Sequence, residues 1–208
     1  MASNGNVFES SWYMRGMEQL MMDFVLNPEL AHEIMRRVTD FYVEHFAKVL
    51  AAARGRIDLV FTADDIAGQE GLLLSPAMWE EFLLDYQRPV LERFALVSYG
   101  CCENLTHKIG GVLSIPNLRI FVSSAWTDLA KVVDAVGDRY TIMWRQKAGD
   151  VVFPDDLSGQ RRHLREGLRI AKGCYVQIVL RELQTLRGRM RRLHEWARIA
   201  KEEAAAHC

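Results

Sequence analysis

The sequence predicts an α/β fold with about five parallel strands, outer helices and an N-terminal helical segment. From residue 55 onward, short β-rich runs alternate with helical stretches, and repeated strand-then-helix units form parallel sheets with right-handed crossovers. Half of the 208 residues are hydrophobic, which is enough for a sizeable core. Such units resemble part of a (β/α)8 TIM-type barrel, which needs eight strands when closed; an open sheet is the alternative.

The chain is expected to form one domain, 1–208, that begins with helices. Residues 1–11 are polar and small at first and are expected to be disordered, and 12–54 form a helical lead-in. Within it, Asn27 is a candidate N-cap and Pro28 suits the first helical position. Gly55 then ends the long helix.

Residues 55–188 contain the strand-then-helix units, and 189–208 form a C-terminal helix. Helices are predicted to start at Ser75, Thr127 and Ser158, because these hydroxyl residues cap helix N-termini. A shorter helix is expected at about 105–113. The predicted strands are residues 57–61, 96–99, 118–122, 140–144 and 175–180.

Composition excludes several classes of function. The formal net charge is -1, which argues against a nucleic-acid partner or a polybasic membrane anchor. No window offers about 18 consecutive apolar residues, so no membrane span is predicted. Of the four cysteines two are adjacent and one is terminal, a poor disulfide framework, so a reduced, cytoplasmic protein is expected.

Polar or reactive side chains follow every predicted strand. Because the carboxyl ends of parallel strands share one rim, where such folds place their sites, we expect a small-molecule site there. In strand order the candidates are Asp64 and Asp65; Tyr99, Cys101, Cys102 and Glu103; Trp126; Arg145 and Lys147; and Arg181 and Glu182.

Each group has a chemical interpretation and a plain structural alternative. Asp64 and Asp65 could pair with a cationic substrate or act as a base, or simply cap a helix. Arg145 and Lys147 could hold an acidic substrate, Arg by a bidentate contact, or be ordinary exposed charges. Trp126 could form a stacking wall or belong to the core.

The stretch Cys101-Cys102-Glu103 offers two thiolates and a carboxylate, the ligand types of a catalytic zinc site with an open position. His107 would join only if its loop folded back. Cys174 precedes its strand, so it belongs at the opposite end of the sheet, about 20 Å away at roughly 3.3 Å per residue. No spaced cysteine or histidine pair supports the metal, and small buried cysteines are the alternative.

Four stretches resemble the uroporphyrinogen decarboxylase superfamily, in particular its methyltransferase-like branch. They are "DDIAGQEGLLLSPAMWEEFLLDYQRPVLERF", "SYGCCENLTHKI", "IPNLRIFVSSAWTDLAKVVDAVGDRYTI" and "EWARIAKEE". The resemblance implies a (β/α)8 barrel, of which this chain matches roughly strands four to eight. It also implies either a decarboxylase without a cofactor or a zinc-dependent methyltransferase that works with a corrinoid partner.

The chain departs from both patterns. The decarboxylase's key aspartate and arginines lie on earlier strands and have no counterpart here. Where the methyltransferases carry His-x-Cys, this chain has Tyr99-Gly100-Cys101, so only the cysteine matches. Arg181 and Glu182 stand near the position of the last cysteine ligand. A variant zinc site would use Cys101, Cys102 and Glu103, with Glu182 as a fourth ligand.

Three hypotheses follow from these residues. In the first, a methyltransferase-like domain uses Cys101, Cys102 and Glu103 on zinc. In the second, a decarboxylase binds substrate carboxylates with Arg145 and Lys147. In the third, the chain is a non-catalytic half-barrel. Because a five-stranded half-barrel exposes two edges and its inner face, we expect a homodimer or a partner that completes the barrel.

Overall fold

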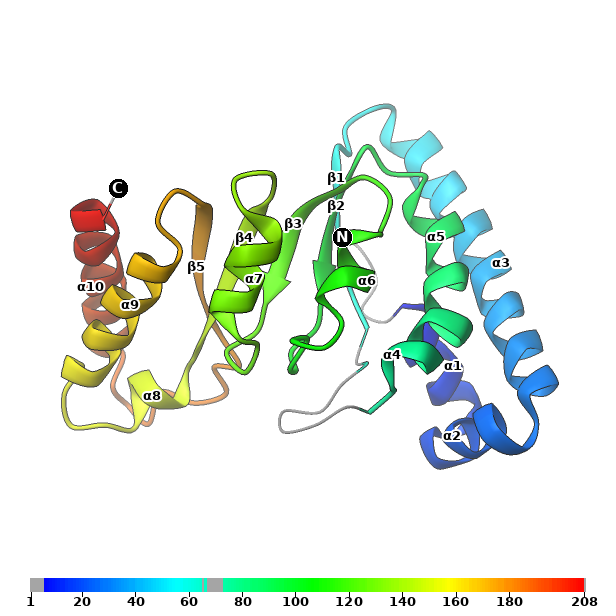
Figure 1. The fold of residues 1–208 in the computed structure, drawn as a ribbon, viewed down its shortest axis with the longest axis horizontal. Helices are drawn as coiled ribbons and strands as arrows, with labels where there is room; N and C mark the ends of the chain where they lie inside the picture. Colours follow the sequence, from blue (N-terminus) through cyan, green and yellow to red (C-terminus); the bar gives the residue numbers. More distant parts are fainter. Residues whose placement is uncertain (1–5, 65, 67–72, 208) are drawn as a thin grey trace.

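The computed structural model describes residues 6–64, 66 and 73–207. One parallel sheet runs through it in the order β1-β2-β3-β4-β5 (Figure 1). This sequential parallel order with helices between the strands confirms the predicted fold class, a partial TIM-type barrel. The strands are β1 (Leu59–Ala63), β2 (Leu96–Gly100), β3 (Leu118–Ser123), β4 (Thr141–Lys147) and β5 (Tyr175–Arg181).

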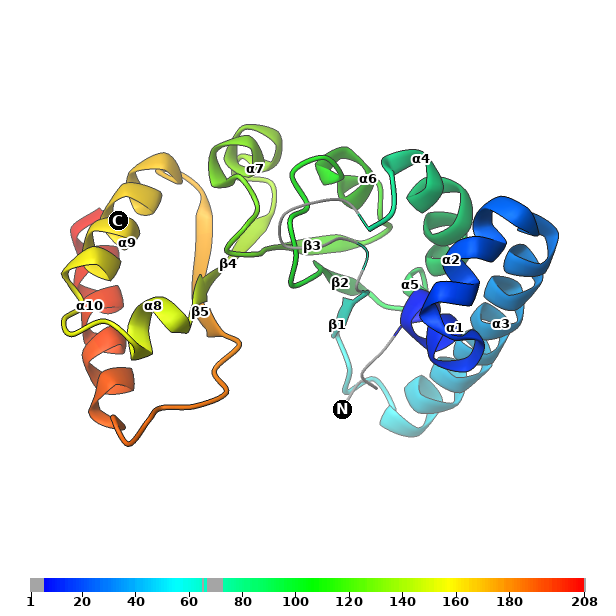
Figure 2. The same ribbon diagram turned by 90° about the horizontal axis from the view of Figure 1, so that it is seen from below.

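The helices that follow the strands form an outer layer. The sheet curves, and these helices lie along its convex side (Figure 2). None of the helices in the described ranges is long and apolar enough to cross a membrane. The layer consists of α4 (Pro76–Trp79), η1 (Glu80–Leu84), α5 (Asp85–Leu91), α6 (Ile109–Leu113), α7 (Leu129–Val136), α8 (Gly149–Val152), α9 (Ser158–Ile170) and α10 (Arg191–His207).

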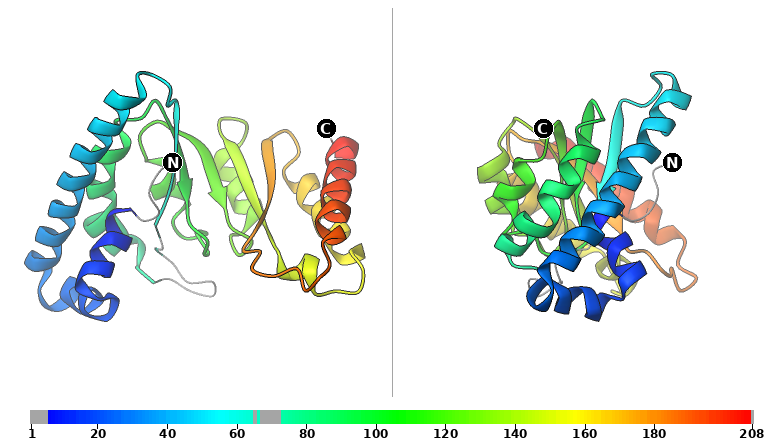
Figure 3. Two further views of the ribbon diagram at one scale, coloured as in Figure 1. Left: turned by 180° about the vertical axis from the view of Figure 1, so that it is seen from behind. Right: turned by 90° about the vertical axis from the view of Figure 1, so that its right-hand side faces the viewer.

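Three N-terminal helices pack beside the first strands, at one end of the molecule (Figure 3). They are α1 (Val7–Arg15), α2 (Met17–Leu26) and α3 (Pro28–Ala53). The expectation of disorder over residues 1–11 is wrong from residue 6 onward, because Asn6 caps α1 and both Val7 and Phe8 are fully buried. Residues 1–5 lie outside the described residues.

The predicted N-caps of three helices are confirmed only in part. Ser75 does cap α4, since its hydroxyl accepts a hydrogen bond from the backbone N–H of Met78. At α7 the cap is Asp128 rather than Thr127, because the Thr127 hydroxyl is engaged by neighbouring loops. Ser158 is the first helical residue of α9 and not its cap.

The two faces of the sheet differ sharply in packing. On the convex face, Trp144 presses on α9 so closely that a Cβ at Gly167 would lie 2.0 Å from its ring. Side chains alternate along a strand, so Arg145 faces the concave side, where it lies over the Phe61 ring. No helix in the described ranges covers that side, and its apolar residues Leu59, Phe61, Leu96 and Tyr175 are 40 to 62% exposed.

Candidate functional site

Three cationic residues lie at the carboxyl ends of the last two strands. Arg145 and Lys147 lie on β4, and Arg181 ends β5 directly opposite Lys147 in the strand register. All three share one parity of the alternating side chains and therefore the concave face. We call Arg145, Lys147 and Arg181 the basic rim.

Arg145 is the buried member of the basic rim. Its side chain is only 3% exposed, and its guanidinium carbon lies 5.7 Å from the centre of the Phe61 ring. One nitrogen, Nη1, donates to the backbone oxygen of Cys101 at 3.2 Å. The Nε atom is buried and has no hydrogen-bond partner among the described residues. Burial lowers the pKa of this guanidinium, and the nearby sulfur of Cys102 opposes that effect.

Cys102 joins the end of β2 to the basic rim. Its sulfur accepts hydrogen bonds from Nη1 of Arg145 and from Nη2 of Arg181, each at 3.3 Å. The remaining cation, Lys147, lies with its ammonium 5.1 Å from the centre of the Trp126 ring. The structure thus gives two contacts among the residues predicted from the sequence: Cys102 with Arg145 and Arg181, and Trp126 with Lys147.

Cys101 lies under this surface rather than on it, while Glu103 is half-buried. Cys101 is fully buried, and burial raises the pKa of its thiol well above the usual range, with the Glu103 charge adding to the effect. The thiol donates to the backbone oxygen of Glu103 at 3.9 Å. The hydroxyl of Ser124 also donates to that oxygen, which fixes the loop after β2.

Lys108 is a buried lysine that the sequence reasoning missed. It is 1% exposed, and its ammonium donates to the backbone oxygen of Ile66 at 2.6 Å. Burial lowers the pKa of this ammonium to about 8, although Cys101 and Glu103 oppose the shift. Nothing in the local sequence separates it from an exposed lysine, because its hydrogen-bond partner, Ile66, lies 42 residues away in the sequence.

The residues proposed for zinc do not suit a metal ion. Among the described residues, no three His, Cys, Asp or Glu side chains are grouped to hold a cation. The Cys102 sulfur contacts two guanidiniums, which repel a divalent cation, and Cys101 favours its neutral thiol. Glu182 lines a separate pocket with Phe153 and Gln184. His107 is exposed.

Asp64 and Tyr99 belong to a buried network on the convex side. The Asp64 carboxylate accepts from the backbone N–H groups of Phe8 and Glu9 and from Nε2 of Gln87. The Tyr99 hydroxyl donates to the Gln87 side-chain oxygen at 3.0 Å, and burial raises the Tyr99 pKa well above its usual value.

This network contradicts the rim positions expected for two residues. Asp64 holds the N-terminus of α1, and Tyr99 faces the helices rather than the side that carries Arg145. Neither therefore lies with the basic rim. Asp65, the other predicted carboxylate, lies outside the described residues.

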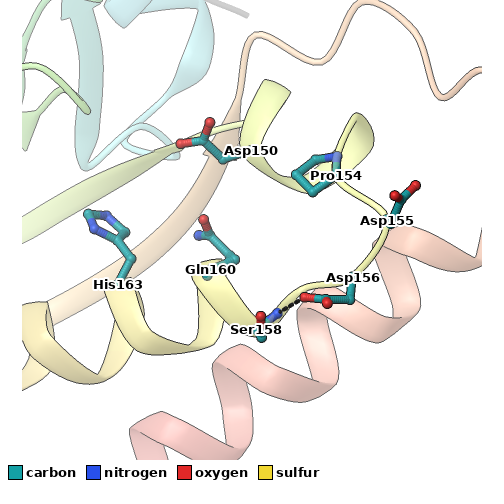
Figure 4. Close-up of a pocket in the computed structure, with 8 residues that line it drawn as sticks. Asp150, Pro154, Asp155, Asp156, Ser158, Gln160 and His163 are labelled. Atoms are coloured by element: carbon teal, nitrogen blue, oxygen red, sulfur yellow. Dashed lines mark hydrogen bonds between the residues drawn. The ribbon is translucent and has the colours of Figure 1, made fainter.

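A hollow on the other side of β4 has the opposite charge. It is lined by Asp150, Asp155, Asp156 and His163, between α8 and the start of α9 (Figure 4). Asp156 accepts a hydrogen bond from the Ser158 backbone N–H at 2.7 Å, so one of the acids stabilises the turn into α9. Burial lowers the pKa of His163, which favours its neutral form. An anionic ligand would be repelled here and attracted to the basic rim.

Comparison with known families agrees with this architecture. The family model described as Uroporphyrinogen decarboxylase (URO-D) matches residues 7–143, about two thirds of the chain. The chain belongs to the uroporphyrinogen decarboxylase family. The family match includes Cys102 and Trp126 but ends just before Arg145, so the three cations of the basic rim lie beyond it. A search of curated proteins finds no match to this member of the family.

Proposed function

We propose that the basic rim binds the carboxylates of a small molecule, and that this molecule is a polycarboxylated tetrapyrrole of the kind a uroporphyrinogen decarboxylase acts on. The observation that carries the proposal is Arg145, a buried guanidinium whose Nε lacks a partner among the described residues. A buried cation without a counter-anion is costly, and a ligand carboxylate would relieve that cost.

The neighbouring residues suit such a ligand. Arg145 and Arg181 can each present a planar fork to a carboxylate, and their shared contact with Cys102 holds the two forks close together. Trp126, already beside Lys147, offers a flat face for a pyrrole ring. A carboxy-lyase of this type needs no cofactor, so the chain's own cations would balance the charge of the substrate.

Methyl transfer with a corrinoid partner is the other activity that the family resemblance implies. It depends on a zinc-held thiol, and the proposed ligands point to different surroundings: Cys101 into the core, Cys102 onto two guanidiniums, and Glu182 into its own pocket. No contact of the described residues favours this activity over carboxylate binding.

The test is a titration of the full chain with uroporphyrin, a stable polycarboxylated tetrapyrrole. Binding is measured by tryptophan fluorescence. We expect saturable binding that weakens at least about tenfold in Arg145→Met, equivalent to about 1.4 kcal/mol. Arg169→Met is the matched control, since Arg169 is exposed on α9. The proposal fails if the unaltered chain does not bind, or if both variants lose affinity equally.

We further propose that the chain forms a homodimer through its concave face. The exposed apolar residues there support the proposal, since large exposed apolar surface marks protein interfaces. Tyr175, on the edge strand, is 62% exposed. Native mass spectrometry should find a dimer at micromolar concentration that Tyr175→Glu dissociates. A monomeric unaltered chain would contradict the homodimer.

A further inference from the structure

The sulfur of Cys102 lies where a ligand carboxylate would be bound. Two guanidiniums donate to it at 3.3 Å, one of them from Arg145, which is 97% buried and has an Nε without a partner among the described residues. Guanidinium forks of this kind ordinarily take carboxylate or phosphate oxygens. A thiol is a weak acceptor, so the two cations are incompletely neutralised by it.

We propose that Cys102 is an oxidation site for peroxides, and that its sulfinate closes the carboxylate site by occupying the two guanidiniums. A sulfinate resembles a carboxylate, with one negative charge shared by two oxygens. Formed on Cys102, it would present those oxygens directly to Arg145 and Arg181. The blocking effect rests on the proposed carboxylate-binding function, whereas the oxidation itself does not.

The chemistry uses two molecules of peroxide. In the first step the sulfur attacks one peroxide oxygen, the O–O bond breaks, and the thiol becomes a sulfenic acid as one water is released. In the second step the sulfenic sulfur attacks another peroxide in the same way. It yields a sulfinic acid and a second water, and the acid then loses its proton to solvent and becomes the sulfinate. Both guanidiniums stabilise the negative charge that develops on sulfur and oxygen.

The chain contains its own reference thiols. Cys101, the adjacent residue, is fully buried in the core, and burial raises the pKa of its thiol, so it is protected from oxidants. Cys174 is partly exposed but lies before β5, at the opposite end of the sheet. Burial also raises the pKa of Cys174. Burial therefore accounts for selectivity over Cys101, and the two guanidiniums of Cys102 account for selectivity over Cys174.

The experiment treats the full chain, in a Cys208→Ser background, with increasing hydrogen peroxide and measures each thiol by peptide mass mapping. We expect Cys102 to gain two oxygens at least tenfold faster than Cys174. In Arg145→Met the ratio should fall toward one, while Arg169→Met leaves it unchanged. Equal rates at Cys102 and Cys174 in the unaltered chain would overturn the oxidation site.

A second readout tests whether the anion closes the site. Cys102→Asp places a permanent carboxylate between the guanidiniums, and Cys102→Ser does not. Uroporphyrin should bind Cys102→Asp and the oxidised chain at least tenfold more weakly than Cys102→Ser. Equal affinities would overturn the blocking effect. If the unoxidised chain does not bind uroporphyrin, the proposed function and the blocking effect fail together. The oxidation rates of Cys102 and Cys174 still test whether Cys102 is an oxidation site.

Discussion

Arginines on the two sides of the sheet have different hydrogen-bond partners. In the convex helical layer, the buried Glu203 carboxylate on α10 accepts hydrogen bonds from Arg161 and Arg165 on α9, at 2.8 to 3.0 Å. On the concave side, Arg145 and Arg181 converge on the sulfur of Cys102 instead. The helical layer pairs Arg161 and Arg165 with a carboxylate, whereas the concave side directs two arginines at a sulfur.

This difference separates residues that hold the fold from residues available for a ligand. Cations already paired with carboxylates have little left to offer an anion, whereas Arg145 keeps a buried Nε without a partner among the described residues. Apolar residues show the same contrast, because Phe121 on the convex face is fully buried and Phe61 on the concave face is 42% exposed. Stability should depend on the convex face and ligand affinity on the concave one.

The largest change in stability should come from Phe121→Ala, and Phe61→Ala is the matched variant on the concave face. Phe121→Ala leaves a cavity in the core and should lower the free energy of unfolding by about 3 to 5 kcal/mol. Phe61→Ala removes a partly exposed ring and should cost less than about 1 kcal/mol. Urea unfolding followed by circular dichroism measures both. Similar losses of unfolding free energy in the two variants would contradict the claim that stability depends on the convex face.

Glu203 should make the helical layer sensitive to acid. Hydrogen bonds from Arg165 and Arg161 lower its pKa from 4.5 to about 2. Because the folded pKa is lower, this stabilisation is complete above pH 4.5 and disappears as the pH falls toward 2. Glu203→Gln should cost about 2 kcal/mol at pH 7 and flatten the stability profile over that range. An unchanged acid profile would show that the pair contributes nothing.

Asp64→Asn tests whether this carboxylate supports the fold. The variant keeps the shape of the side chain but removes the charge that faces the N-terminus of α1 and the Gln87 amide. We expect a loss of about 1 to 3 kcal/mol in thermal or urea unfolding, with uroporphyrin affinity unchanged in the folded protein. Lost affinity at full stability would instead place Asp64 in the binding site.

A similarly small stability change to that of Phe61→Ala should come from Lys147→Gln. An exposed cation over an aromatic ring contributes about 0.5 to 1 kcal/mol, so unfolding should shift by no more than that. Uroporphyrin affinity should nevertheless fall several-fold at low salt, because a charge at the rim is lost. Lys131→Gln on α7 is the control, and an equal fall in that variant would exclude a specific role for Lys147.

Much of the fold could be predicted from the sequence, because β-rich runs and helix signals are local. The candidate site was also predictable in part. Parallel strands end on one side of the sheet, so Cys102, Trp126 and the basic rim were expected on the same edge. The orientation of Tyr99 could not be predicted, because the end of β2 is buried on both faces and its pattern lacks alternation. Asp64 capping α1 and Lys108 reaching Ile66 are contacts across 55 and 42 residues, which no local pattern reveals.

Hydrogen exchange in the presence of uroporphyrin, read by mass spectrometry, tests the central claim most directly. If the basic rim binds carboxylates, amides should gain protection in peptides that cover residues 101–103, 145–147 and 179–182. Peptides from α9 and from the acidic hollow beside it should exchange as before. Protection confined to residues 150–170, or no change anywhere at saturating uroporphyrin, would contradict the claim.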